Sequence, residues 1–100
     1  MSDVTLKVYS WLSDALPGRT LTHAVLVEPF REGETFWHLL EELSCRYPSF
    51  EKVIYYRRAR CFYPHVNVIY KGEAADGVRD LDRKLEHGDE IIFVPMYAGG

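Results

Sequence analysis

Several features are scarce in this sequence, and each scarcity removes a class of protein. Only two cysteines, Cys45 and Cys61, occur among 100 residues, so a disulfide framework is not expected and both thiols are predicted to be reduced. No apolar run approaches the roughly 20 residues that span a bilayer, and the N-terminus lacks the basic and apolar parts of a signal peptide. We therefore expect a cytoplasmic protein without a membrane partner.

An excess of basic residues is also missing. The formal net charge is −3, which argues against the broad positive field behind most nucleic-acid binding and favours a basic partner surface. One local exception is the basic and aromatic segment 55–64, whose rings and arginines could clamp single-stranded nucleic acid. The alternative is that its aromatics pack on the domain while its arginines stay in water or pair with carboxylates. We favour that alternative and predict no nucleic-acid partner.

The spacing of histidines and cysteines does not indicate a metal centre. No pair among the four histidines and two cysteines has the CxxC or HxxxH spacing of a zinc site, so no metal ligands are predicted. A cysteine with a histidine could be a nucleophile and its base, but no oxyanion motif accompanies either thiol. We expect buried or idle thiols. Trp11 and Trp37 are candidates either for interface anchors or for covers of a sheet edge.

What is present indicates one folded domain of the α+β class. Hydrophobic residues make up 47 % of the chain, which is typical of a globular domain. Alternation over residues 4–12 predicts a strand with an aliphatic inner face. Turn residues at 13–19 and a β-branched run at 23–28 then predict an antiparallel hairpin. The inner face of the first strand is predicted to hold Val4, Leu6, Val8 and Leu12.

A helix is predicted to begin after Thr35, whose hydroxyl can cap a free backbone N–H of the first turn. Apolar residues then follow at i, i+3, i+4, i+7 and i+11, which places them on one helical face. Pro48 is expected to help end the helix. Residues 49–65 are predicted only as a helical turn and a loop. The apolar face consists of Phe36, Leu39, Leu40, Leu43 and Tyr47.

The last third of the chain predicts two more strands. Residues 66–70 are β-branched, residues 71–73 form a turn, and Leu81 and Leu85 are expected to plug the core. The apolar run 90–94 predicts a central strand that is buried on both faces. The predicted fold is a mixed sheet of four to five strands with one main helix packed across it.

The C-terminal residues resemble the signature of a known family. Gly88-Asp89-Glu90, an apolar strand, Pro95 and a terminal Gly99-Gly100 resemble the end of the ubiquitin-like sulfur carriers, typified by the molybdopterin synthase small subunit and the thiamine sulfur carrier. Residues 32–35 and 39–43 are similar to the start of that family's helix. The resemblance implies a β-grasp domain over residues 1–95 and a flexible Gly-Gly tail over residues 96–100.

The resemblance also implies a chemistry for the tail. A ubiquitin-activating-type adenylyltransferase would use ATP to adenylate the Gly100 carboxylate. A sulfurtransferase would then convert it to a thiocarboxylate, and a synthase large subunit would accept the sulfur. Such a protein is a co-substrate or small subunit rather than an enzyme, and it holds no permanent cofactor. Gly99 and Ala98 would thread the tail into its partners. The expected partner-binding residues are Phe93, Pro95, Met96 and Tyr97.

Molybdopterin synthesis, with molybdenum or tungsten, is the pathway that residues 88–95 resemble most. The tail departs from the common family pattern, because a second proline often stands in place of Met96 and a small or β-branched residue in place of Tyr97. Three alternatives therefore stay open. The sulfur could serve thiamine or cysteine synthesis, Gly100 could be conjugated to lysines as in a protein modifier, or the chain could be an interaction domain that uses an exposed sheet face.

Overall fold

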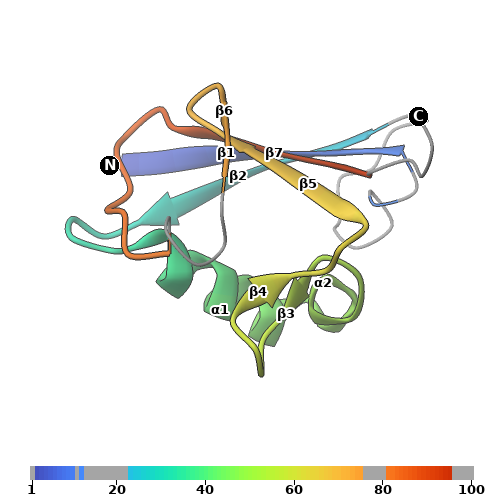
Figure 1. Cartoon of the computed structure of the whole chain (residues 1–100). Coiled ribbons are helices and arrows are strands. Elements are labelled where there is room, and N and C mark those ends of the chain that lie inside the picture. The colour runs from blue at the N-terminus through green and yellow to red at the C-terminus, as the bar shows by residue number, and fades with distance from the viewer. Residues whose placement is uncertain (1, 11, 13–22, 76–80, 96–100) are drawn as a thin grey trace.

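A computed structural model describes residues 2–10, 12, 23–75 and 81–95 of the chain. The fold consists of a five-stranded sheet, two helices and a separate two-stranded hairpin (Figure 1). The elements are β1 (Ser2–Tyr9), β2 (His23–Phe30), α1 (Phe36–Arg46), α2 (Pro48–Val53), β3 (Tyr55–Tyr56), β4 (Cys61–Phe62), β5 (Val66–Tyr70), β6 (Glu73–Ala74) and β7 (Glu90–Pro95).

The strands of the sheet lie in the order β2-β1-β7-β5-β6. β1 pairs with β2 in the antiparallel sense, which confirms the predicted hairpin, and Thr5 lies opposite Val27. β7 lies between β1, to which it runs parallel, and β5, to which it runs antiparallel. The prediction of a central strand at residues 90–94 is therefore confirmed. The sheet is mixed because β7 runs parallel to β1, while all the other neighbouring strands are antiparallel.

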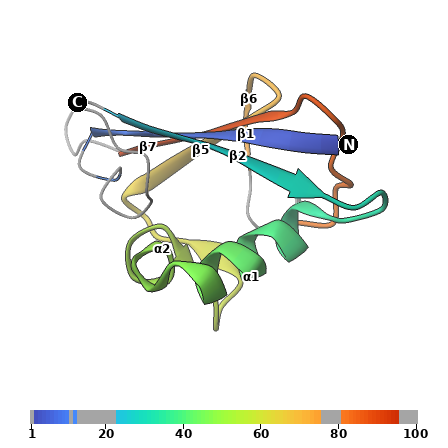
Figure 2. The ribbon, with the colours of Figure 1, turned by 180° about the vertical axis from the view of Figure 1, so that it is seen from behind.

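One face of the sheet carries the core. The helices and the β3–β4 hairpin all lie on the same side of the sheet, as the front and back views show (Figures 1 and 2). Val4, Leu6 and Val8 are fully buried, which confirms these members of the predicted inner face. Leu12 is also buried, but it lies outside the strand, because β1 ends at Tyr9 and not at residue 12 as predicted. Leu81 and Leu85 are buried as well, as predicted. Alternate residues of β1 therefore face the helices, as a strand with period two requires.

Helix α1 begins as predicted. The Thr35 hydroxyl accepts a hydrogen bond of 3.2 Å from the backbone N–H of His38, which satisfies one free donor of the first turn. The first four apolar residues of the predicted helical face, Phe36, Leu39, Leu40 and Leu43, are buried. Pro48, however, lies in the first turn of α2, where its missing N–H costs nothing, so it begins the second helix.

Two further predictions need correction. β7 is not buried on both faces, because Ile92 and Val94 on its outer face are half-buried while Ile91 and Phe93 are in the core. The helices cover only one face of the sheet, so the outer side chains keep contact with solvent. Residues 49–65 hold not only a helical turn but also the β3–β4 hairpin, with Tyr55 opposite Phe62. Strands of two residues are too short to show a period in the sequence.

Within the described part of the chain, both cysteines are free thiols, as predicted. Cys45 is exposed and Cys61 is half-buried, so neither thiol is buried, and the expectation that they are idle stays a prediction. No helix among the described residues has the length and apolar character needed to cross a membrane.

Candidate functional site

The candidate site is built around β7, because this strand leads to the tail. β7 begins after a tight turn in which Gly88 has a φ of +86°, a conformation that favours glycine. The Gly88 N–H donates to the Asp3 carbonyl at 3.0 Å, and the Thr5 N–H donates to the Asp89 carbonyl at 2.9 Å. These bonds join the turn to β1 and fix the register in which β7 enters the sheet.

The Asp89 side chain is the buried centre of this turn. Its Oδ2 accepts hydrogen bonds of 2.9 Å from the Tyr70 hydroxyl and from the Glu86 backbone N–H. Burial, together with the hydrogen bond to Asp89, raises the pKa of Tyr70 well above its ordinary value. Lys71 forms ion pairs with Glu86 and with Asp89. The Gly-Asp-Glu sequence is thus a structural device that starts the last strand.

Two residues predicted to bind partners lie inside the protein. Phe93 is fully buried, and its ring meets Phe50 edge-on at 5.8 Å and Phe62 at 6.2 Å between centroids. Pro95 is also buried and lies opposite Val66 on β5. Because both side chains lie in the core, they offer little contact area at the surface, and their role in partner binding stays a prediction. Both residues hold β7 in place.

The other predicted site residues follow Pro95 in the sequence. These five residues, Met96, Tyr97, Ala98, Gly99 and Gly100, lie outside the described residues. Their roles stay predictions, as does the boundary between the domain and the tail. β7 nevertheless ends at Pro95, immediately before the first of them.

Stacked rings lie at the end of the sheet where β7 stops. On the β1 side, the rings of Tyr9 and His23 stack with centroids 5.5 Å apart. On the β5 side, Tyr63 stacks on His65 at 5.5 Å, with ring planes only 9° apart. The register explains this placement, because Phe93 lies opposite Val8 and Pro95 lies opposite Val66. This arrangement was not visible in the sequence, because only the pairing of strands that are far apart in the sequence brings the two groups of rings to one end of the sheet.

The basic aromatic segment is mostly engaged with its own domain. Arg57 Nε donates to Glu41 at 2.8 Å, and the Arg60 guanidinium lies 4.2 Å from the centroid of the Trp37 ring. Tyr55 is fully buried. Tyr55 and Arg57 agree with the interpretation that the aromatics pack on the domain while the arginines stay in water or pair with carboxylates, whereas the contact of Arg60 with a ring was not predicted. This contact leaves Trp37 half-buried beneath an arginine, whereas Trp11 lies outside the described residues.

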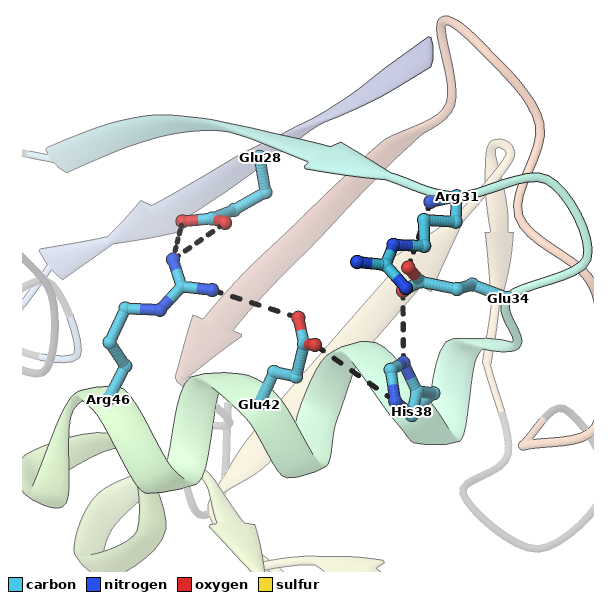
Figure 3. Close-up of polar contacts among 6 residues, drawn as sticks. All are labelled: Glu28, Arg31, Glu34, His38, Glu42 and Arg46. Atoms are coloured by element: carbon cyan, nitrogen blue, oxygen red, sulfur yellow. Dashed lines mark hydrogen bonds and ion pairs between the residues drawn. The ribbon is translucent and has the colours of Figure 1, made fainter.

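A chain of charged groups connects α1 to β2 (Figure 3). Arg46 Nη1 donates to both oxygens of the buried Glu28 carboxylate, at 2.9 and 2.8 Å, and Arg46 Nη2 lies 3.7 Å from Glu42. His38 lies between two carboxylates, with Nδ1 3.0 Å from Glu34 and Nε2 4.0 Å from Glu42. The hydrogen bond to Glu28 raises the pKa of Arg46. This chain ties the helix to the edge of the sheet.

Three of these side chains could hold a metal ion by geometry. Glu34, His38 and Glu42 each offer one ligand atom, and the three atoms lie within 4.8 Å of one another. The spacing of histidines and cysteines alone does not reveal this group, whereas the i, i+4, i+8 spacing of two glutamates around a histidine does. Both carboxylates already have partners, since Glu34 accepts from the Arg31 N–H at 2.8 Å and Glu42 faces Arg46. The contacts present are those of an ion-pair chain.

Comparison with known proteins decides the family. The model of the ThiS family matches residues 18–100, which is most of the chain and includes the whole segment from Gly88 to Gly100. The chain belongs to the ThiS family. ThiS-family proteins are ubiquitin-like sulfur carriers, so the predicted family is confirmed. Such proteins generally act as carriers without enzymatic activity and work with E1-like activating enzymes and synthase partners. No curated protein matches the chain.

Solved structures agree on the fold of this ThiS-family chain. Small archaeal modifier protein 1 of Haloferax volcanii has a TM-score of 0.71 at 22 % identity and covers 97 % of this chain and 100 % of its own. Urm1 of Trypanosoma brucei has a TM-score of 0.72 at 18 % identity, and the match covers 99 % of this chain and 96 % of Urm1. A Pyrococcus furiosus protein described as molybdopterin converting factor subunit 1 has a TM-score of 0.70 at 18 % identity. The match covers 97 % of this chain and 100 % of that protein. The predicted β-grasp fold is therefore confirmed.

Proposed function

We propose that this chain carries sulfur on the carboxylate of Gly100 for molybdopterin synthesis. An E1-like enzyme joins the carboxylate to the α-phosphate of ATP and releases pyrophosphate. A hydrosulfide or its protein-bound equivalent then attacks the carbonyl carbon of the acyl adenylate, and AMP leaves with the former carboxylate oxygen. The product is a thiocarboxylate on Gly100, and the chain itself needs no bound cofactor because ATP is used in the partner.

The ThiS family match is the observation that carries this proposal. It extends to residue 100 and so includes Gly99 and Gly100 as well as the turn and strand that precede them. The structure supports the proposal through β7, which is held between two strands and ends at Pro95, five residues before Gly100. A carrier needs such an arrangement, since a rigid domain must present a narrow C-terminal segment that a partner can enclose.

The choice of molybdopterin rests on the resemblance of residues 88–95 to the synthase small subunit. The similar structures include a molybdopterin converting factor subunit, but they also include a small archaeal modifier protein and Urm1. Thiamine or cysteine synthesis and conjugation to lysine are therefore the competing fates of the same adenylate. Each fate leaves a different product, so one experiment can separate them.

The test is an intact-mass measurement. The purified chain is incubated with ATP, Mg²⁺, sulfide and the E1-like adenylyltransferase of the same organism, and a variant without Gly99 and Gly100 is treated identically. The expected result is a gain of about 16 Da, the difference between sulfur and oxygen, in the full-length chain only. Omission of ATP must abolish the gain. A full-length chain that stays unchanged with the active enzyme would refute the proposal.

The acceptor is then identified with the sulfurated chain. Transfer to the molybdopterin precursor in the presence of a synthase large subunit, with return of the carrier to its original mass, supports the proposed pathway. Transfer that occurs only with thiamine or cysteine enzymes assigns the sulfur elsewhere. Bands of higher mass that contain Gly100 linked to a lysine amine would assign the modifier function.

A further inference from the structure

An aromatic side chain on the β3–β4 hairpin is exposed without an evident structural purpose. Among the described residues, the large hydrophobic side chains that are exposed are Val25, Val27 and Tyr56. The Tyr56 ring is 42 % exposed and stacks on Tyr63, with centroids 5.8 Å apart and planes at 22°. Tyr63 in turn stacks on His65. We call Tyr56, Tyr63 and His65 the ring stack.

The inner two members of the ring stack are fixed by α2. The Tyr63 hydroxyl donates to the Glu51 carbonyl at 2.9 Å, and the His65 Nε2–H donates to the Val53 carbonyl at 2.6 Å. These carbonyls belong to the last turn of the helix, where backbone acceptors lack intrahelical partners. Tyr56 is different, since no hydrogen bond within the described residues engages its hydroxyl. The stack thus holds one free aromatic side chain on a rigid base.

The ring stack lies close to the point where the chain leaves the sheet. His65 directly precedes Val66, and Val66 pairs with Pro95 at the end of β7. In Figure 1, β7 ends on the side of the molecule where α2 and the start of β5 lie. Five residues reach about 17 Å when extended, so Gly100 cannot be farther than that from Pro95. An enzyme that encloses Gly100 must therefore bring its own surface near the ring stack.

We propose that the ring stack is a docking surface for the E1-like enzyme that adenylates Gly100, with Tyr56 as its anchor. This inference rests on the proposed function. A rigid aromatic side chain loses little conformational freedom on binding, which is why tyrosine is common among residues that dominate interfaces. Arg58, which follows two residues later, is exposed and has no ion pair within the described residues. The complementary enzyme surface is an apolar pocket bordered by carboxylates.

The proposal is tested by steady-state adenylation, measured as ATP–pyrophosphate exchange with the E1-like enzyme of the same organism. Tyr56→Ala is expected to raise the KM for the carrier about tenfold, which is the effect of losing one interface anchor, and to leave kcat unchanged. Tyr56→Phe keeps the ring and should stay within about twofold of the original chain. Thermal unfolding of each variant verifies that the domain is intact.

Val27→Ala is the comparison on another surface, because Val27 is apolar and even more exposed, at 56 %, but lies on the edge strand β2. A smaller increase in KM for Val27→Ala than for Tyr56→Ala supports the ring stack. An unchanged KM for Tyr56→Ala, or an equal or larger increase for Val27→Ala, overturns the proposal and places docking on the sheet face. Failure of the proposed function is distinct, since the unmodified chain would then show no exchange at all.

Discussion

The two ends of β7 differ in chemistry. At its start, Asp89 is buried and accepts two hydrogen bonds, and Lys71 adds ion pairs around the turn. At its end, Pro95 pairs with Val66, which directly follows His65 of the ring stack, and Phe93 pairs with Val8, which directly precedes Tyr9. The start of the strand is closed by polar contacts within the domain, whereas the end displays an aromatic side chain with no such contact.

This difference separates the two tasks of a carrier. The polar start fixes the register of β7, and one step of slippage would turn Phe93 from the core to the solvent face. The aromatic end offers contact area that the fold itself does not need. Substitutions at the start should therefore affect stability, and substitutions at the exposed part of the end should affect recognition.

The largest effect is expected from Phe93→Ala, which tests whether this residue near the end of β7 belongs to the core. Loss of a fully buried phenylalanine should lower the free energy of unfolding by about 4 kcal/mol. Ile92→Ala, on the half-buried outer face, should cost about 1 kcal/mol. Chemical denaturation measures both values. Equal losses of stability for the two variants would contradict the difference in burial between the two faces of β7.

Asp89→Ala tests the polar start of the strand. Removal of the buried carboxylate leaves the Tyr70 hydroxyl and the Glu86 N–H without their acceptor, at a cost of about 2 to 3 kcal/mol. His87→Ala, in the same turn but exposed, should cost less than about 0.5 kcal/mol. Denaturation midpoints check the pair. A mild effect of Asp89→Ala would mean that the turn does not depend on its buried acceptor.

Alkaline pH should weaken the fold through its buried tyrosines. Burial raises the pKa of Tyr55 to about 12, so the folded state keeps this phenol neutral while the unfolded state ionises near pH 10. Stability is then complete below pH 10 and falls as the pH rises from 10 to 12, by about 2 kcal/mol for this residue. The free energy of unfolding measured across this range should fall less steeply in Tyr55→Phe than in the unmodified chain.

The two buried tyrosines provide a closer comparison at neutral pH. Tyr70, near the start of β7, donates to Asp89, so Tyr70→Phe should cost about 1.5 kcal/mol. The Tyr55 hydroxyl is buried and has no hydrogen-bond partner within the described residues. Tyr55→Phe should therefore leave the free energy of unfolding unchanged or raise it by up to about 1 kcal/mol. A large loss in Tyr55→Phe would show that its hydroxyl does have a partner.

Apart from the comparison variants, the smallest loss of stability is expected at Gly88, in the turn itself. A Cβ at this position would meet nothing within 4 Å, so only the backbone conformation at φ +86° opposes a side chain. Gly88→Ala should cost about 1 kcal/mol, and Gly88→Asn less, because asparagine tolerates this region better. Thermal unfolding can resolve the order. A cost above about 3 kcal/mol for both variants would point to a steric clash instead.

Most of the fold could be predicted because the strands and the main helix have clear periods. β1 alternates regularly, and α1 has a cap at Thr35 and an apolar face of several residues. The β3–β4 hairpin could not be predicted in this way, since each of its strands has only two residues. Its stability comes from burial of Tyr55 against the core, which is a tertiary effect.

The candidate site was predictable only in part. The Gly88-Asp89-Glu90 turn was visible as a motif, and the apolar run 90–94 predicted a buried Phe93. The run could not show that Ile92 and Val94 on the outer face keep contact with solvent, because an apolar strand reads the same on both faces. The ring stack depends on α2 and the start of β5 lying together at the end of the sheet where β7 stops. This arrangement follows from strand order, and strand order is set by contacts between residues far apart in the sequence.

The position of β7 between β1 and β5 has a consequence for biosynthesis. Thr5 pairs with Glu90, so the central ladder of the sheet joins segments that are separated by almost the whole printed sequence. A chain whose translation has not passed residue 95 lacks this strand and cannot close its sheet, which makes folding slow and dependent on a segment far from β1 in the sequence. A truncated or stalled product would expose an unpaired strand edge and become a substrate for proteases. Quality control by the cell would thus precede any use of the C-terminus.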